Sequence, residues 1–183
     1  MTKRTWMLVL ALPALAWTAW VLGAEEKTHK LTSVSPRKMA DSLHAVIAAD
    51  QETYVKLVLQ KNDAADGEAV GHAAMLRSAA QSIQTRGAEF SYVLRSLWPV
   101  DPNNGPQTEV EQTGLAFVAE HPGENFYTEE ELGGRSYFTA VYAERATLTS
   151  CIECHNQHPR SPRQDLKLDD VMGGIVVRVP LEF

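Results

Sequence analysis

The chain has 183 residues, of which 44% are hydrophobic. A chain of this length can bury one ordinary core and is short for two, so we expect a single domain. Its 17 lysines and arginines are outnumbered by 23 aspartates and glutamates, which gives a formal net charge of −6 at pH 7. This acidic balance, spread along the chain, excludes the dense basic surface that a nucleic-acid partner requires.

The N-terminus has the pattern of an export signal. A basic start and an apolar run from Trp6 to Leu22 precede the acidic Glu25. We expect residues 1–24 to be a signal peptide or an uncleaved membrane anchor, and residues 25–183 to be the exported domain. The predicted location is therefore periplasmic or otherwise extracytoplasmic, with membrane contact only through the anchor.

Two long helices are expected in the first part of this domain. Between residues 35 and 62, apolar side chains recur every three to four positions, and Ser35 followed by proline is a favourable helix start. His44 falls on the edge of the apolar stripe and Asp50 falls inside it. Residues 70–87 show a second helical pattern, which ends at a glycine.

The remainder of the chain combines short strands with one short helix. Aromatic, aliphatic and β-branched residues predict strands at 90–100, 135–144 and 175–181, and segment 125–131 is a candidate for a fourth. The Thr-Glu-Val-Glu pattern at Thr108 is a capping box that opens the helix. Because helices and strands are segregated, the predicted class is α+β, with an antiparallel sheet flanked by helices and long helices at the N-terminal end.

The segment Cys151-Ile152-Glu153-Cys154-His155 carries the most specific chemistry. The chain has two cysteines and six histidines, so chance is a poor explanation for this spacing. Two thiols three residues apart fit the two vinyl groups of a haem, and the imidazole that follows them reaches the iron. The segment predicts one haem c, attached through Cys151 and Cys154 with His155 as proximal ligand, on a loop or single helical turn.

Three other interpretations of the cysteines stay open. A thioredoxin-like dithiol has the same spacing, but it belongs to a βαβ unit for which this sequence has no pattern. A zinc site would use Cys151, Cys154, His155 and His158, although zinc ligand pairs usually come from two separate segments. A structural disulfide would close a very short, strained loop. Haem attachment accounts for the histidine as well as for both thiols.

A haem also needs an apolar pocket and partners for its propionates. At strand or helix spacing, large apolar residues more often form plain core, and surface arginines are more often solvated. The candidates for the pocket walls are Trp98, Tyr137, Phe138, Tyr142 and Met172, and those for the propionates are Arg135, Arg145, Arg160 and Arg163.

The sixth position of the iron separates an electron carrier from a sensor, because an empty or labile position admits a diatomic molecule. His44 is the first candidate for a distal ligand, as an imidazole on the edge of an apolar helix face, and His72 is the alternative. Met75 or Met172 are further candidates, and an open position is the remaining one. The other histidines, His29, His121 and His158, are expected on the surface or in the attachment loop.

Several segments resemble a known family of haem proteins. The run Cys-x-x-Cys-His-Asn-x-His-x-x-Ser-Pro that starts at Cys151 is the most specific of them. The chain is similar to the monohaem c-type cytochrome family with a PAS-like haem domain, long described as a domain of unknown function. The other segments that carry the resemblance are 90–99, 127–141 and 170–174.

The resemblance implies a PAS-like antiparallel sheet flanked by helices, with a haem held against it, in a periplasmic sensor or redox module. In many relatives the domain is the sensing part of a histidine kinase or chemoreceptor, and we expect no output domain in a chain of this length. Some relatives offer a cysteine as sixth ligand. This chain has none to offer, because attachment uses both thiols.

The predicted function is that of an exported monohaem c-type cytochrome, a one-electron carrier or redox-responsive protein that works with a redox partner protein. The alternative is a module that senses a diatomic gas or redox state and signals to a separate membrane partner. An enzyme is not expected, and peroxidase-like activity stays open only if a histidine and an arginine face the iron together.

Overall fold

Two helices open the described part of the chain, which covers residues 34–59 and 71–182 of the computed structural model. Helix α1 is Pro36–Tyr54, continued by a π-helical turn, Val55–Leu59, and helix α2 is His72–Thr85. The Ser35 hydroxyl caps α1 by accepting a hydrogen bond from the Lys38 N–H at 3.3 Å. Both predicted helices are confirmed, while the predicted signal in residues 1–24 and the segment 60–70 lie outside the described residues.

The sheet has four antiparallel strands in the order β1-β4-β3-β2. The fourth strand suggested at 125–131 is confirmed as β2, and it forms a hairpin with β3 through Gly133-Gly134. These glycines have φ values of 60° and 78°, which such a two-residue turn requires and glycine adopts without strain. The strand bounds are Ser91–Arg95 for β1, Phe126–Leu132 for β2, Arg135–Arg145 for β3 and Val171–Pro180 for β4.

Two strand predictions need correction. Strand β1 ends at Arg95 rather than at residue 100, because the Ser96 hydroxyl donates to the Met172 carbonyl at 2.6 Å and accepts from the Trp98 N–H at 3.0 Å. Strand β4 starts at Val171 rather than at residue 175. Its glycines lie within the strand and allow neighbouring backbone to approach closely.

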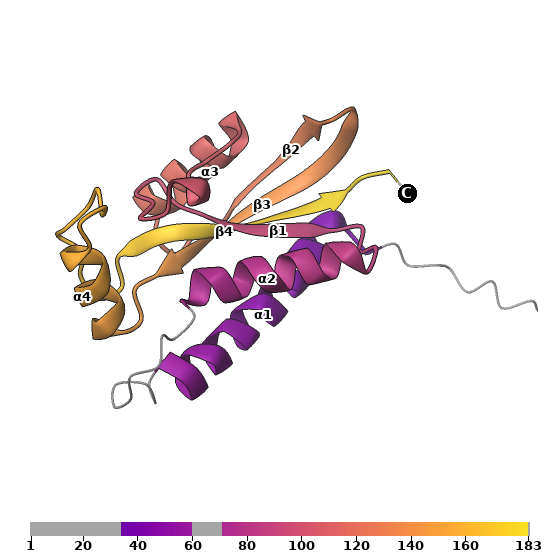
Figure 1. Cartoon of the computed structure of the whole chain (residues 1–183). Helices are drawn as coiled ribbons and strands as arrows, with labels where there is room; N and C mark the ends of the chain where they lie inside the picture. The colour runs from indigo at the N-terminus through magenta and orange to yellow at the C-terminus, as the bar shows by residue number, and fades with distance from the viewer. Residues whose placement is uncertain (1–33, 60–70, 183) are drawn as a thin grey trace, which may run out of the picture. The chain divides into compact units, whose positions relative to one another are not determined.

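Helices cover both faces of the sheet (Figure 1). Helices α1 and α2 pack on one face over a core that includes Ala40, Ile47 and Leu76. Helix α3, Glu109–Glu120, packs on the other face through Leu115 and Val118. The predicted helix start at Thr108 is confirmed, since the Thr108 hydroxyl accepts from the Glu111 N–H at 3.1 Å. The Glu111 side chain accepts from the Gln107 N–H at 2.6 Å, one residue before the Thr108 N–H that a strict capping box would use. The fold is therefore α+β, with four α-helices and a four-stranded antiparallel sheet among the described residues.

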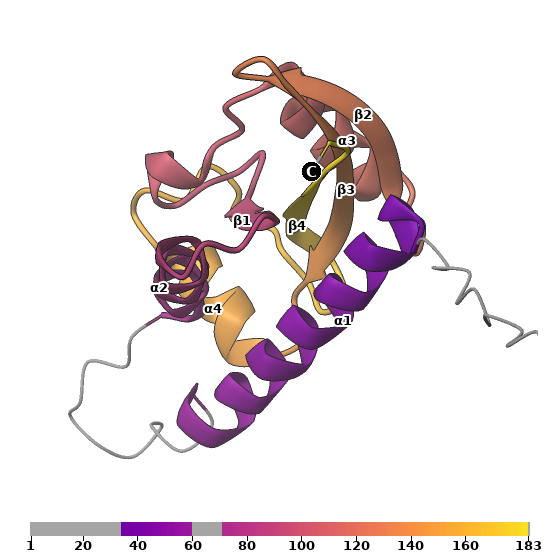
Figure 2. The same ribbon diagram turned by 90° about the vertical axis from the view of Figure 1, so that its right-hand side faces the viewer.

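The predicted attachment loop is wrong in one respect, because the cysteines lie on a regular helix. Helix α4 is Thr149–Gln157, at one end of the sheet near α1 and α2 (Figure 1 and Figure 2). The Asn156 side chain fixes the segment that follows, donating to the Leu166 carbonyl and accepting from the Leu166 N–H, both at 3.0 Å. None of the helices formed by residues 34–59 and 71–182 combines the length and apolar character of a membrane span.

Candidate functional site

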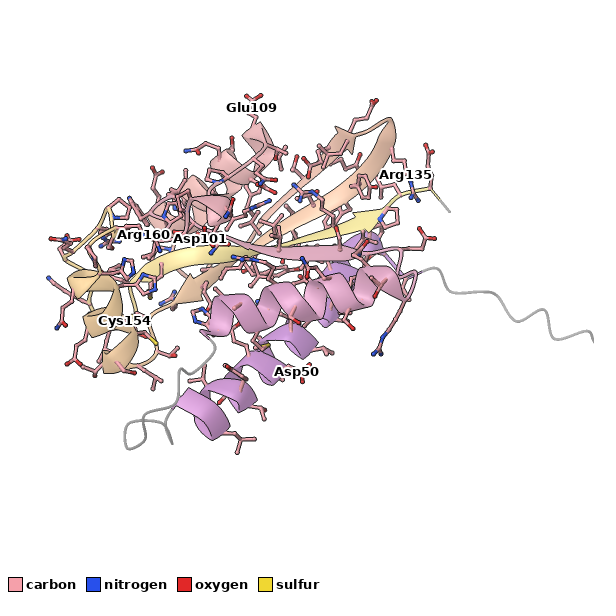
Figure 3. All side chains as sticks on the ribbon, in the orientation of Figure 1. Asp50, Asp101, Glu109, Arg135, Cys154 and Arg160 are labelled. Atoms are coloured by element: carbon pink, nitrogen blue, oxygen red, sulfur yellow. The ribbon has the colours of Figure 1, made fainter. Side chains whose placement is uncertain are left out.

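Helix α4 presents both thiols and the adjacent imidazole from one rigid element. Cys151 is partly buried, Cys154 is exposed, and both are free thiols. Figure 3 places Cys154 on the side of α4 that faces α1 and α2. His155 is partly buried on the same helix. Both thiols and the imidazole therefore come from one short helix beside α1 and α2.

The other interpretations of the cysteines find no support in this geometry. Burial is the main cause that raises the pKa of the Cys151 thiol, whereas a redox-active Cys-x-x-Cys needs a lowered thiol pKa. No three His, Cys, Asp or Glu side chains among the described residues converge on a metal position, which removes the ligand set of the zinc interpretation. The thiols are not joined in a disulfide.

His155 lines a cavity of about 210 Å³ that also has His72 on its wall. His72 is the first residue of α2, so the two imidazoles reach this cavity from different helices. Burial lowers the pKa of both, and the proximity of His155 lowers the pKa of His72 further. Both rings are therefore held neutral, the form in which imidazole binds a metal. The cavity's apolar walls include Leu94, Trp98, Pro99 and Met172.

The five predicted wall residues separate into two groups. Trp98 and Met172 line the cavity with His155. Tyr137 and Phe138 instead pair with Pro180 and Val179 in the register of β3 and β4, away from α4. Phe138 and Tyr142 belong to the core under α1 and α2. Sequence spacing indicated the strand correctly, but it did not show which of its side chains line the cavity of His155.

The structure does not bring His44 to the cavity of His155. The His44 ring stacks on Tyr142, with ring centroids 3.9 Å apart and planes 5° apart. It borders a different cavity, of about 470 Å³, on the α1 side of Glu144. Met75 packs in the core between α1, α2 and the sheet. Of the two predicted distal histidines, His72 shares the cavity of His155.

None of the four predicted propionate partners lines the cavity of His155. Arg135 lies at the opposite end of the sheet from Cys154 and pairs with Glu89 at 3.3 Å (Figure 3). Arg163 pairs with Asp165 and Asp170, and its guanidinium lies 4.9 Å from the Trp98 ring centroid. Arg145 lines the cavity on the α1 side of Glu144, and Arg160 is exposed in the segment after α4.

Sequence reasoning missed three charged residues on the cavity wall, Arg95, Asp101 and Glu144. Arg95 ends β1, while Glu144 follows Tyr142 by two positions in β3. Alternation along a strand would have placed Glu144 on the same face as the buried Tyr142. Glu144 accepts a hydrogen bond from the Gln51 side chain of α1 at 2.5 Å. Burial raises the pKa of Glu144 to about 7. The hydrogen bond from Gln51 acts in the opposite direction and has the smaller effect on this pKa.

The donor set fits a covalently attached haem. Two free thiols three residues apart and an imidazole on the same helix match the vinyl groups and the iron. A second neutral imidazole and apolar side chains share the cavity with His155. Cys151, Cys154 and His155 would hold the porphyrin, with His72 on the wall of the cavity that His155 lines.

Comparisons with known proteins agree with this description of the fold. The crystal structure of the cyanobacterial haem protein Tll0287 matches with a TM-score of 0.55 and 15% sequence identity, over 81% of this chain and 98% of that chain. No curated protein matches the chain. The Tll0287-like family model matches residues 27–180, which is most of the sequence. This chain belongs to the Tll0287-like family.

Proposed function

We propose that the chain binds one haem c. The observation that carries the proposal is that α4 holds the Cys151 and Cys154 thiols together with His155, whose side chain lines an apolar-walled cavity. Thioether bonds to the two thiols and a bond from the His155 ring to the iron use every donor of the motif. The similarity in fold to a protein described as a haem protein supports the haem, and the two free thiols support its covalent attachment.

We propose His72, in place of His44, as the second axial ligand. His72 and His155 line the same cavity, and the pKa of His72 is lowered by burial and further by the proximity of His155. The His44 ring is instead engaged by Tyr142 on the other side of Glu144. Two neutral imidazoles suit an electron carrier, because a firm sixth ligand keeps the iron coordination unchanged between oxidation states.

The proposed role is that of an exported one-electron carrier or redox-responsive protein that exchanges electrons with a partner protein outside the cytoplasm. The bound haem supplies one-electron chemistry at its iron. The described residues hold and orient it, and Leu94, Trp98 and Met172 keep water from the cavity. No enzymatic role is proposed, because the cavity's Arg95 is already engaged, donating to the Asn103 carbonyl at 2.8 Å and pairing with Glu111. We propose that the sheet and its helices form a PAS-like domain.

The mass of the denatured protein tests covalent attachment. Protein matured in a host that assembles c-type cytochromes should be heavier than its polypeptide by one haem and should keep its colour after denaturation. Cys151→Ser and Cys154→Ser together should remove the added mass, while Ser150→Ala on the same helix should keep it. A colourless protein with the mass of the polypeptide alone contradicts the proposal.

Paired histidine variants test the axial ligands. His72→Ala should change a low-spin absorption spectrum towards high spin and let the reduced protein bind carbon monoxide. His44→Ala, the matched control on the other side of Glu144, should leave the low-spin spectrum unchanged. If His44→Ala alone changes the spin state, His72 is not the ligand. If the unaltered reduced protein binds carbon monoxide, the sixth position is open, as the sensing alternative requires.

A further inference from the structure

The cavity that His155 lines is too small to hold a whole haem. Its volume is about 210 Å³, whereas pockets for drug-sized ligands measure about 300–1,000 Å³. Two larger cavities adjoin it. The α1-side cavity, of about 470 Å³, shares the wall residue Glu144 with it. The α2–β1 groove, of about 530 Å³, shares Ala73, Leu94 and Asn104 with it. A haem bound by His155 must therefore extend into at least one of these neighbours.

The two neighbouring cavities border strands on opposite sides of β4. In the sheet order β1-β4-β3-β2, Glu144 of β3 pairs with Gly173 of β4, and Arg95 of β1 pairs with Gly174 of β4. Adjacent strands are about 4.8 Å apart, so the cavity of His155 extends about 10 Å from β3 across β4 to β1. It meets the α1-side cavity at β3 and the α2–β1 groove at β1. A porphyrin can lie across this end of the sheet with one edge towards each neighbour.

The thiols determine which edge of the haem lies on which side. Cys151 precedes His155 by four positions, so it lies about one turn closer to the N-terminal end of α4. That end borders the α1-side cavity, because Leu148, the residue before α4, lines this cavity and accepts from the Cys151 N–H at 3.2 Å. Burial is the largest cause that raises the pKa of the Cys151 thiol, and the nearby charge of Glu144 raises it further. The vinyl edge of the haem therefore belongs on the β3 side.

We propose that the haem propionates lie on the β1 side, where the cavity of His155 meets the α2–β1 groove, and that Arg77 of α2 binds them. The inference rests on the proposed haem site. A haem has its propionates on the edge opposite the two vinyl groups, so thioether bonds on the β3 side direct the propionates towards β1. Arg77 follows His72 by five positions, which is about 7.5 Å along α2. One helix thus provides an imidazole near the iron and a guanidinium near the ring edge.

Arg77 is held in place and still has donors available. Its Nη2 donates to the Asp101 carboxylate and to the Asn104 side-chain oxygen, both at 3.0 Å. Its Nε and Nη1 have no acceptor among the described residues, and its side chain is 46% exposed. The Asn103 N–H also donates to Asp101 at 3.1 Å, so the charge of Asp101 is offset by two residues. The free N–H groups of a fixed guanidinium match the geometry of a carboxylate.

Two other arginines near the site are less suitable. Arg95 is buried, donates to the Asn103 carbonyl and pairs with Glu111. Arg145 has no ion pair with a described residue, but it lines the α1-side cavity, next to the vinyl edge. Arg145 is therefore a matched control for Arg77, as an arginine beside the opposite edge of the haem.

Resonance Raman spectra of the holoprotein test the proposal, because the propionate bending mode reports the hydrogen bonds that the propionates accept. Arg77→Gln should shift this mode, and Arg145→Gln should leave it in place. Arg77→Lys keeps the charge but loses the planar fork, so it should also shift the mode. If Arg77→Gln does not fold, Arg77→Lys carries this test.

The midpoint potential at fixed pH and ionic strength gives a second measurement. Removal of a positive charge from the ring edge favours the oxidised iron. We expect Arg77→Gln to shift the reduction equilibrium about tenfold, which lowers the potential by about 59 mV. Arg77→Lys should restore most of this shift. Arg86→Gln, an exposed arginine at the other end of α2, should change the potential much less.

The possible outcomes separate this inference from the proposed function. A Raman shift in Arg145→Gln but not in Arg77→Gln places the propionates on the α1 side and overturns the inference. A mode that neither variant shifts overturns it as well. Either result in a haem-bearing protein leaves the proposed function intact, whereas a protein without attached haem overturns both.

Discussion

Two glutamates on opposite faces of the same sheet have contrasting partners. Glu111 of α3 is 1% exposed, and its carboxylate lies 3.1 Å from the Arg95 Nε and 3.0 Å from the Arg178 Nη2. Glu144, on the side of α1 and α4, has a hydrogen bond from Gln51 and no described ion pair. The first is a fully buried charge with two countercharges, and the second is a partly buried carboxyl group with none.

The cluster around Glu111 joins α3 to all four strands of the sheet. Arg178 of β4 also pairs with Glu130 of β2 at 2.7 Å, and the Thr139 hydroxyl of β3 donates to Glu130 at 2.7 Å. The Arg95 Nε makes no hydrogen bond to any described residue, so its interaction with Glu111 is one of charge and proximity. Two negative and two positive side chains balance one another here. The balanced cluster fixes the fold, while the unbalanced Glu144 is free to respond to pH.

Breaking the balanced cluster around Glu111 should have the largest effect on the free energy of unfolding. Glu111→Gln leaves Arg95 and Arg178 buried without their shared carboxylate, and losing one partner of a buried ion pair typically costs about 3–5 kcal/mol. Urea unfolding should show this loss of stability. The matched control is Glu109→Gln, an exposed residue in the first turn of the same helix, which should change stability by about 0.5 kcal/mol or less. Equal effects of the two variants would contradict the structural role of the cluster.

The unbalanced glutamate should make stability depend on pH. The pKa of Glu144 is raised from 4.5 to about 7 in the folded protein. Its contribution is therefore fully present below about pH 4.5 and is lost as the pH rises through about 7, a loss of up to about 3 kcal/mol. Unfolding measured across this range should show the decline, and Glu144→Gln should flatten it. Glu111→Gln should leave the pH dependence of stability in this window unchanged. If Glu111→Gln removed it and Glu144→Gln did not, Glu144 would not be the group that responds to pH.

Local signals in the sequence predicted the elements that carry these residues. The Ser35 cap, the Thr108 cap and the two-glycine turn at Gly133 each depend on neighbouring residues, and each is present. The end of β1 was not predictable in this way. It depends on a hydrogen bond between Ser96 and Met172, which are 76 positions apart.

The functional site was predictable from the sequence only in part, because it also depends on contacts between residues that are far apart in the sequence. The spacing of Cys151, Cys154 and His155 specifies a chemistry within five residues, whereas the distal side depends on which helices meet. Periodicity placed Asp50 in the apolar stripe of α1, yet Asp50 is exposed and Gln51 is buried against Glu144 (Figure 3). A rotation of one position around a helix is enough to exchange a surface residue for a site residue.

Gly173 of β4 contacts both glutamate regions, because it lies beside Glu144 and against the backbone of Arg95. A substitution at Gly173 should therefore have an intermediate effect on stability. It pairs with Glu144 in the β3–β4 register, and a Cβ at this position would lie 2.4 Å from the Arg95 carbonyl oxygen of β1. Gly173→Ala must push these strands apart, at a cost of about 1–3 kcal/mol. Gly71→Ala, where a Cβ meets nothing within 4 Å, is the control and should cost less in the same urea unfolding. Equal costs would show that the close approach of the strands is unimportant.

A third carboxylate, Asp41 of α1, is intermediate between Glu111 and Glu144 in how its charge is stabilised. It accepts hydrogen bonds from the Tyr127 and Tyr142 hydroxyls, both at 2.8 Å, and its side chain is 43% exposed. Because water and Arg37, whose Nε lies 4.0 Å from the carboxylate, also stabilise this charge, Tyr142→Phe should cost only about 1 kcal/mol in urea unfolding. Tyr137→Phe, whose hydroxyl has no hydrogen bond among the described residues, is the control. A cost for Tyr142→Phe as large as that for Glu111→Gln would mean that countercharges do not set the order of these effects.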